Sequence, residues 1–322
     1  MDRAMNGFAI DTHVSTSATA GKWGRRVGEA ALFLVIVGSF YQKSKAGESQ
    51  PVPYDLLLIA CMGIFFLFGL KLPRGIAWPA LLWGLVLIGY ILGGVAAPYM
   101  DLVQDALTVS AYQVCAFIFF SAYVYEDPGR RMPLLLNAWT VGAVVVSSIA
   151  IAAYFGAMPN AADYLAMGRA TGTFNDPNVF GPFLIPPSIY LAQRLSMGRS
   201  MRALLLAPGL AILLLGVLLS FSRGAWGSLI LSGTVYFGLT LATSRSGRQS
   251  MRLIVSAVVM GVLGVGMLAA ALSTPQVQAL FKERAMLVQD YDVGEQGRFE
   301  SQKRAFVKTL ENPLGLGPNQ WA

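Results

Sequence analysis

Long apolar runs, separated by short polar segments, make up most of the chain. Each run has roughly the length that a helix needs to cross the ~30 Å hydrocarbon core of a bilayer. The pattern therefore predicts an all-α fold, a polytopic membrane helix bundle with about nine transmembrane helices. The predicted spans are Val27–Tyr41, Tyr54–Leu70, Ile76–Ala97, Ala106–Tyr125, Pro133–Phe155, Val179–Leu195, Ala203–Ser220, Ala225–Ala242 and Leu253–Ser273.

Two of these runs depart from a plain membrane span. The first run is short and contains Glu29, a carboxylate that hydrocarbon does not solvate. The sixth run contains Pro182, Pro186 and Pro187. Prolines inside a span kink the helix and free backbone carbonyls from their usual partners. The sixth span is therefore expected to be bent.

Composition supports the membrane class. The chain is 55% hydrophobic and 13% charged, whereas soluble domains carry about 25% charged residues. The formal net charge is +7, but the basic residues lie in short loops between apolar runs, so nucleic acid is not expected as a partner. Cys61 and Cys115 lie inside apolar runs, and His13 is the single histidine. This set predicts no metal site.

The distribution of Lys and Arg predicts the orientation. With a cytoplasmic N-terminus, the inner segments hold 14 basic residues and the outer loops before the last segment hold 4. This asymmetry follows the positive-inside rule. The inner residues are Arg3, Lys22, Arg25, Arg26, Lys71, Arg74, Arg130, Arg131, Arg194, Arg199, Arg202, Arg245, Arg248 and Arg252; the outer ones are Lys43, Lys45, Arg169 and Arg223.

The same pattern divides the chain into three parts. Residues 1–24 form a polar tail, expected to be disordered and cytoplasmic. Residues 25–273 form the transmembrane bundle. Residues 274–322 begin a polar outer segment that follows the last span. In that segment, 276–289 has apolar residues at roughly helical spacing and is expected to lie on the membrane surface or, by default, to pack on the bundle.

Arg223 is the only charged residue between Ala203 and Ser244, and it lies in the short connection Ser220-Phe221-Ser222-Arg223-Gly224. The pattern predicts a helical hairpin through the membrane with Arg223 at its tip. One interpretation is a functional cation, since a charge near hydrocarbon is costly to keep. The other is an arginine that extends to the lipid headgroups. Its position on the outer side, against the positive-inside rule, favours the first.

The longest interior outer loop, 156–178, carries a second arginine, Arg169, between two glycines. Asn175, Asp176 and Asn178 near its end are good N-caps for the following span. A helix N-terminus offers free N–H groups to an anion, and a guanidinium adds a bidentate phosphate donor. For Asp176 and Asn178, an ordinary turn with a helix cap explains the sequence equally well.

A third outer arginine, Arg298, follows Gly297 at the start of a helix predicted over Arg298–Leu310. Taken alone, it could be one charge on a solvated helix face. Together, Arg169, Arg223 and Arg298 predict binding of an anionic ligand at the outer leaflet. They do not predict an ion path through the bilayer, which would need charged residues within the spans.

These segments resemble the O-antigen ligase and O-antigen polymerase family. The similarity rests on the stretch from Gly168-Arg169 to Asn178, on Ser220-Phe221-Ser222-Arg223-Gly224, and on Gly297-Arg298 leading to Asn312-Pro313-Leu314-Gly315-Leu316-Gly317. It covers roughly residues 158–322, while the earlier spans match only in being hydrophobic.

The resemblance implies a multi-pass glycosyltransferase of the bacterial inner membrane, with residues 274–322 in the periplasm. Such a protein moves a glycan from undecaprenyl pyrophosphate to a lipid A-core or other glycan acceptor, in O-antigen or exopolysaccharide biosynthesis. Other polysaccharide-assembly proteins are candidate partners, and no cofactor is expected. Arg169, Arg223 and Arg298 would bind the pyrophosphate, supported by Asn175, Asn178 and Ser222.

The chain departs from the family in one respect. Ligases of this type are expected to carry a histidine further along the periplasmic loop, whereas this sequence has no histidine after His13. Either the chain is truncated at its C-terminus or the protein lacks that base. Asp176 and Glu300 are the weaker candidates for the catalytic base. The alternatives to a ligase are a repeat-unit polymerase, a lipid-linked glycan transporter and an inactive membrane partner.

Overall fold

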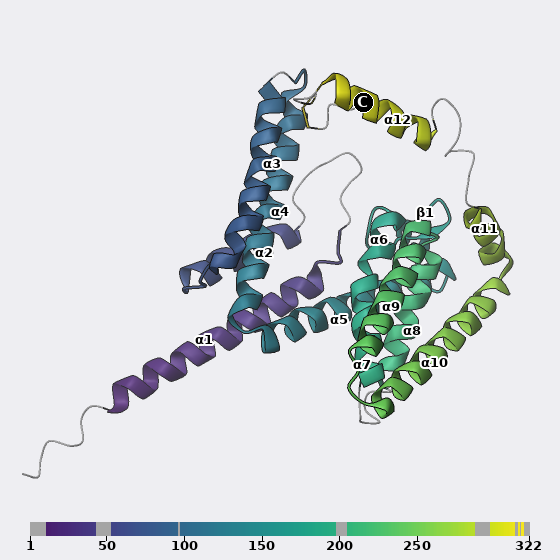
Figure 1. The fold of residues 1–322 in the computed structure, drawn as a ribbon, viewed down its shortest axis with the longest axis horizontal. Helices are drawn as coiled ribbons and strands as arrows, with labels where there is room; N and C mark the ends of the chain where they lie inside the picture. The colour runs from purple at the N-terminus through teal and green to yellow at the C-terminus, as the bar shows by residue number, and fades with distance from the viewer. Residues whose placement is uncertain are drawn as a thin grey trace, which may run out of the picture.

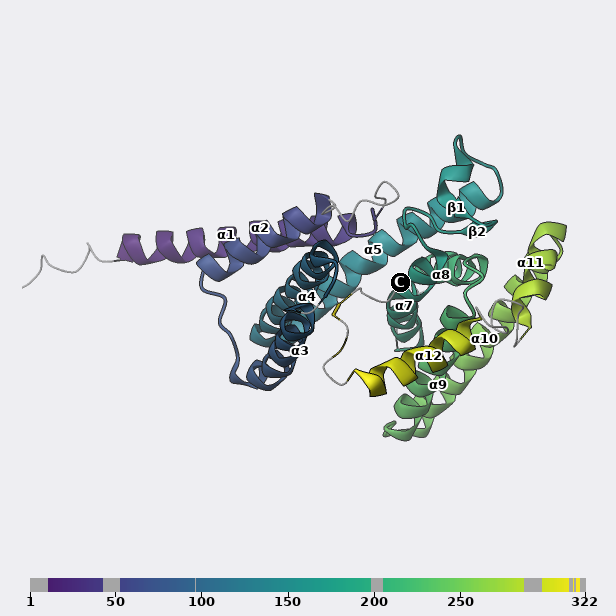
Figure 2. The same ribbon diagram turned by 90° about the horizontal axis from the view of Figure 1, so that it is seen from above.

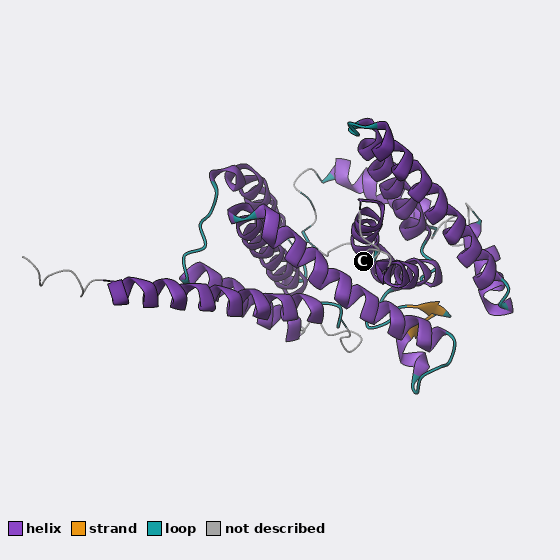
Figure 3. Cartoon of the chain, turned by 90° about the horizontal axis from the view of Figure 1, so that it is seen from below, coloured by secondary structure: helices purple, strands orange, loops and turns teal. Residues whose placement is uncertain are grey.

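The computed structural model describes residues 11–42, 53–95, 97–197, 205–286, 297–312, 315 and 317–318. Almost all of this part of the chain is helical, as the sequence predicts (Figure 3). The N-terminal half comprises α1 (Asp11–Gly38), α2 (Pro53–Leu67), the short helix η1 (Arg74–Ile76), α3 (Ala77–Val95), α4 (Met100–Glu126) and α5 (Pro128–Tyr154).

The C-terminal half begins with a small loop structure and continues as helices (Figure 1). The loop holds η2 (Ala161–Tyr164) and the two-residue strands β1 (Leu165–Ala166) and β2 (Arg169–Ala170). The helices are α6 (Pro177–Phe183), α7 (Ile185–Met197), α8 (Ala207–Leu219), α9 (Arg223–Ala242), α10 (Gly247–Leu272), α11 (Pro275–Ala285) and α12 (Arg298–Glu311).

Five helical segments in the described part of the chain are long and apolar enough to cross a membrane, by length and composition. They are Arg74–Val95, Met100–Glu126, Pro128–Tyr154, Arg223–Ala242 and Gly247–Leu272, and α2 and α8 are shorter apolar helices. Many of their large apolar side chains are exposed, among them Trp78 and Ile230. Such surfaces suit lipid rather than water. The protein is therefore an all-α membrane protein.

Helix α5 connects two hydrophobic clusters (Figure 2). Its first half, through Ala138, packs in a cluster with α1, α2 and α4. Its second half, through Ala143 and Val146, packs in a cluster formed with α6, α7 and α8. Close packing in the second cluster is possible because small and β-branched residues follow one another from Thr140 to Ala153. This helix thereby fixes the N-terminal helices relative to the C-terminal ones.

The sixth predicted span is interrupted, in agreement with its prolines. Helix α6 ends at Phe183 and α7 begins at Ile185. Pro187 has no N–H to donate to the carbonyl of Phe183, four residues earlier. That carbonyl instead accepts a hydrogen bond from the Trp139 indole N–H at 3.1 Å. A side chain from α5 thus satisfies the backbone group that the proline leaves free.

Glu29, the charge within the first predicted span, is ion-paired. Its side chain is 8% exposed, and its Oε2 lies 2.5 Å from Nη2 of Arg130 in α5. Near this pair, the buried Arg131 forms an ion pair with Glu126 at 2.8 Å. A carboxylate can be buried in a membrane bundle when a cation meets it there. These contacts link α1 to α5 and α5 to the end of α4.

Helix α1 begins at Asp11, inside the tail of residues 1–24, and runs without a break into the first apolar run. That this tail is disordered and cytoplasmic remains a prediction. No proline occurs between Asp11 and Gly38, so no residue there blocks backbone hydrogen bonding. Residues 1–10 lie outside the described part of the chain.

Candidate functional site

A two-stranded hairpin positions Arg169. Strands β1 and β2 are antiparallel, with Ala166 opposite Arg169. The two residues that connect them, Met167 and Gly168, have φ values of 52° and 72°. Two consecutive positive φ angles are typical of the tight turn that matches the twist of a hairpin. The sequence predicted a loop here but not these short strands.

Arg169 is buried, with 6% of its surface exposed. Its Nε donates to the carbonyl oxygen of Ser220 at 2.8 Å, and its Nη2 donates to Oδ1 of Asn178 at 2.9 Å. Both acceptors are neutral. Through these bonds one guanidinium holds together β2, the start of α6 and the turn between α8 and α9. The structure therefore brings together two stretches that the sequence singled out separately, the loop from Gly168 to Asn178 and the turn from Ser220 to Gly224.

The turn between α8 and α9 has a constrained backbone. Phe221 has a φ of 46°, which is uncommon for a bulky residue, and its side chain is 1% exposed. Ser220 Oγ accepts from the N–H of Ser222 at 3.3 Å. Ser222 in turn caps α9, since its side chain accepts from the N–H of Ala225. Ser222 thus has the capping role typical of serine at a helix start.

Arg223 is the first residue of α9 and is partly exposed. Its Nη1 donates to the carbonyl oxygen of Met286 at 3.1 Å, just after the end of α11. The N-terminus of a helix already carries a partial positive charge, so a cation in its first turn does not stabilise the helix. The arrangement instead concentrates positive potential beside the turn that Arg169 contacts.

Helix α11 packs over this end of the bundle (Figure 1). Val277 is fully buried, and the Phe281 ring stacks on Trp226 of α9 with centroids 5.4 Å apart. The Leu280 side chain lies 3.6 Å from the point that a Cβ on Gly168 would occupy. The default expectation for 276–289, packing on the bundle, is confirmed for the described residues to Met286.

The last turn of α11 carries a further cation, Arg284, that the sequence analysis did not single out. Arg284 lies near the end of this helix, with 15% of its side chain exposed, and its Nε lies 3.4 Å from Glu283. Arginine and lysine are common in the last turn of a helix, where they complement the partial negative charge of the free carbonyls. Nothing in the local sequence therefore distinguishes Arg284 from an ordinary helix-end cation.

The loop before α6 is attached to the end of α1. Thr173 donates its hydroxyl to the carbonyl of Phe40, and its own carbonyl accepts from the N–H of Gln42 at 3.0 Å. Asn175 donates its amide to the carbonyl of Gln42 at 3.4 Å. Asn175 therefore anchors the loop to α1. No local signal in the sequence predicts this contact, because its partners are 133 residues apart.

Asp176 is the N-cap of α6, and its Oδ1 accepts from the N–H of Asn178 at 2.7 Å. The helix-cap interpretation therefore accounts for this exposed carboxylate. The side chain of Asn178 has another function, because its Oδ1 accepts from Arg169. Asp176 thus caps α6, and Asn178 contacts Arg169.

The last two predicted site residues lie on α12. Arg298 is its first residue, and its side chain lies outside the described part of the chain. Glu300 is 42% exposed at its side chain and lies 3.8 Å from Lys303. Figure 1 draws α12 apart from β1 and α9. Among the described residues, no group of His, Cys, Asp and Glu could hold a metal ion.

Gly181 in α6 allows the close approach of α6 to the turn. A Cβ at this position would lie 2.6 Å from Ser220 Oγ and 2.8 Å from Ala225 Cβ. We expect Gly181→Ala to destabilise the protein by about 1–3 kcal/mol, the usual cost of overpacking. Thermal unfolding in detergent measures this loss.

Gly227→Ala is the matched control for that substitution. Gly227 lies in α9, and outside its own helix no heavy atom lies within 4 Å of the position that a Cβ would occupy, so its replacement adds no clash. Equal melting temperatures for the two variants would contradict the close contact between α6 and the turn.

The C-terminal part of the chain is similar to a known protein family. Residues 208–322 match the family model described as O-antigen ligase. The matched range includes Arg223 and Arg298, while Arg169 precedes it. The resemblance noted in the sequence is thus confirmed over this range. The comparisons with curated proteins and with solved structures gave no match.

Proposed function

We propose that this membrane protein, which carries an O-antigen ligase segment at residues 208–322, transfers a glycan from undecaprenyl pyrophosphate to a sugar hydroxyl. The family match supports a function of the O-antigen ligase or polymerase type in general. The donor, the acceptor and a location in the inner membrane with the site facing the periplasm are our proposals. Residues 274–322 would then begin a periplasmic loop.

One observation carries the proposal. Arg169 is hydrogen-bonded to Ser220, in the turn that leads directly into Arg223. Arg169 therefore contacts the turn that carries Arg223, and the sequence predicted both arginines to be outer cations. A pyrophosphate group carries several negative charges, and guanidinium groups bind phosphate oxygens with directed hydrogen bonds. The negative charge and the acceptor oxygens of pyrophosphate therefore complement the positive charge and the N–H donors of this site.

The proposed reaction is a single displacement at the anomeric carbon. The acceptor hydroxyl oxygen forms a new bond to that carbon, and the bond from the carbon to the pyrophosphate oxygen breaks. The electron pair leaves with undecaprenyl pyrophosphate, and the hydroxyl proton passes to a base that we do not assign. Arg223, on the exposed side of the turn, would stabilise the charge that develops on the leaving group. Arg169 would mainly position the turn.

The test uses the full chain reconstituted in liposomes with a fluorescent glycan on undecaprenyl pyrophosphate and an acceptor glycan. We expect glycan on the acceptor and free undecaprenyl pyrophosphate in equal amounts. A ladder of lengthening products would indicate a polymerase. Transport of the intact lipid-linked glycan across the bilayer, with no transfer, would contradict the proposal.

A further inference from the structure

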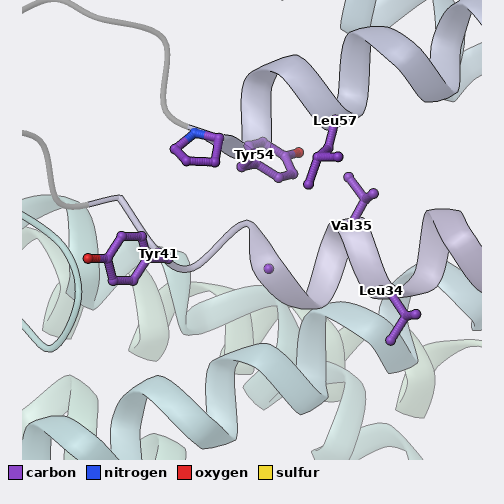
Figure 4. Close-up of a pocket in the computed structure, with 7 residues that line it drawn as sticks. Leu34, Val35, Tyr41, Tyr54 and Leu57 are labelled. Atoms are coloured by element: carbon purple, nitrogen blue, oxygen red, sulfur yellow. The ribbon is translucent and has the colours of Figure 1, made fainter.

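We infer that the groove between α1 and α2 holds the hydrocarbon chain of the lipid-linked donor, next to the site that binds its pyrophosphate. This inference rests on the proposed function. The groove encloses about 220 Å³ and is lined by Leu34, Val35, Gly38, Tyr41, Pro53, Tyr54 and Leu57. Figure 4 shows Val35 and Leu57 facing each other across it, with Tyr54 beside Leu57 and Tyr41 at one end.

The lining suits a hydrocarbon chain. Its side chains are aliphatic or aromatic, and Leu34 and Leu57 remain 69% and 55% exposed. The volume is smaller than the ~300–1,000 Å³ of pockets that enclose a whole small ligand. The groove therefore fits a segment of a longer chain whose remainder stays in the bilayer.

Tyr41 indicates how deep the groove lies. Tyrosine is enriched at the boundary between membrane and water, where its ring contacts lipid and its hydroxyl contacts water. Tyr41 is 53% exposed and follows the end of α1, and α2 begins at Pro53, which also lines the groove. The groove thus begins at the polar end of both helices and extends about 6 Å along α1 from Gly38 to Leu34. A lipid whose hydrocarbon chain lies in the groove would have its headgroup at the membrane surface.

The end of α1 that lines the groove is hydrogen-bonded to the loop that leads to the candidate site. Phe40 and Gln42, on either side of Tyr41, accept from Thr173 and Asn175. The same loop leads within three residues to Asn178, the acceptor of Arg169. This link distinguishes the groove from other lipid-facing surfaces of the bundle. The hydrocarbon chain and the pyrophosphate of one molecule would then lie on two segments that are hydrogen-bonded to each other.

Gly38 allows the groove to be filled without disturbing the fold, because no heavy atom outside its own helix lies within 4 Å of its Cβ position. Gly38→Leu is the test variant. Gly63→Leu is the control, since Gly63 is an exposed glycine of α2 with equal free space. Both variants add the same side chain to a membrane-facing surface, but only the first adds it to the groove.

The probe is undecaprenyl pyrophosphate with a photoreactive group near the start of its chain, in nanodiscs that hold the full chain. We expect labelling of α1 and α2, reduced about tenfold in Gly38→Leu and unchanged in Gly63→Leu. Equal labelling of all three proteins, or labelling confined to other helices, would overturn the inference. So would equal labelling of the groove by a photoreactive phosphatidylglycerol, because the groove would then hold bulk lipid.

Excess inorganic pyrophosphate separates this inference from the proposed function. If both are correct, it lowers labelling of the unchanged protein by competing for the headgroup site. If labelling of the groove persists unchanged, the pyrophosphate site of the proposed function is wrong, while the groove for the chain is supported. If pyrophosphate competes but Gly38→Leu has no effect, the function stands and the groove inference fails.

Discussion

Replacing Arg223 with Lys is expected to lower glycan transfer by at least ~10²-fold, the effect of removing one donor to a developing negative charge. The substitution keeps the positive charge but loses the planar fork that binds two phosphate oxygens at once. Arg223 begins α9 and donates to a backbone carbonyl, Met286 O, from a partly exposed position, so membrane insertion and folding should be retained. The measurement is transfer in liposomes, with protein amount normalised by quantitative blotting.

Arg248→Lys is the matched control. Arg248 also lies in the first turn of a helix, α10, and is exposed. It lies at the other end of the bundle, since α9 spans 20 residues, about 30 Å, between Arg223 and Ala242. We expect its replacement to leave transfer unchanged. Unaltered transfer in Arg223→Lys would remove Arg223 from the mechanism, and similar losses in both variants would indicate a general charge effect.

Replacing Gly172 with Ala is expected to destabilise the protein by about 2–4 kcal/mol, through backbone strain and overpacking together. Gly172 has a φ of +58°, which a residue with a side chain rarely adopts. A Cβ there would also lie 2.6 Å from Val146 Cγ2 and 3.1 Å from the Val146 carbonyl oxygen in α5. The loop that carries Arg169 and Asn178 would have to move away from α5, and transfer should fall with stability.

Gly156→Ala separates the effect of backbone strain from the effect of overpacking. Gly156 has a similar φ of +68°, but no heavy atom lies within 4 Å of its Cβ position. It should therefore show the strain alone, about 1 kcal/mol. Thermal unfolding of both variants in the same detergent gives the comparison. A Gly172→Ala protein as stable as Gly156→Ala would show that the loop does not pack on α5 as described.

The site was only partly predictable. Arg223 could be selected from sequence because a charged residue is rare in apolar surroundings, and the predicted orientation puts both Arg169 and Arg223 on the outer side. The hydrogen bond from Arg169 to Ser220 could not be predicted, because the two residues are 51 positions apart in the sequence. Nothing in the local sequence specifies which carbonyl accepts from the guanidinium. Asp176 was equally well explained as a cap, and the structure shows it capping α6. The roles proposed for Arg298 and Glu300 remain predictions.

The sequence by itself determined the class of the protein, because the length and hydrophobicity of a run decide locally whether a helix can cross a bilayer. It also determined the interruption of the sixth run, since a proline lacks its N–H in any context. Only the tertiary structure decided that Trp139 satisfies the freed carbonyl of Phe183, that α11 packs on Trp226, and that the loop before α6 is attached to α1. Those contacts depend on which helices are neighbours, and adjacency is set by the packing of side chains from distant parts of the chain.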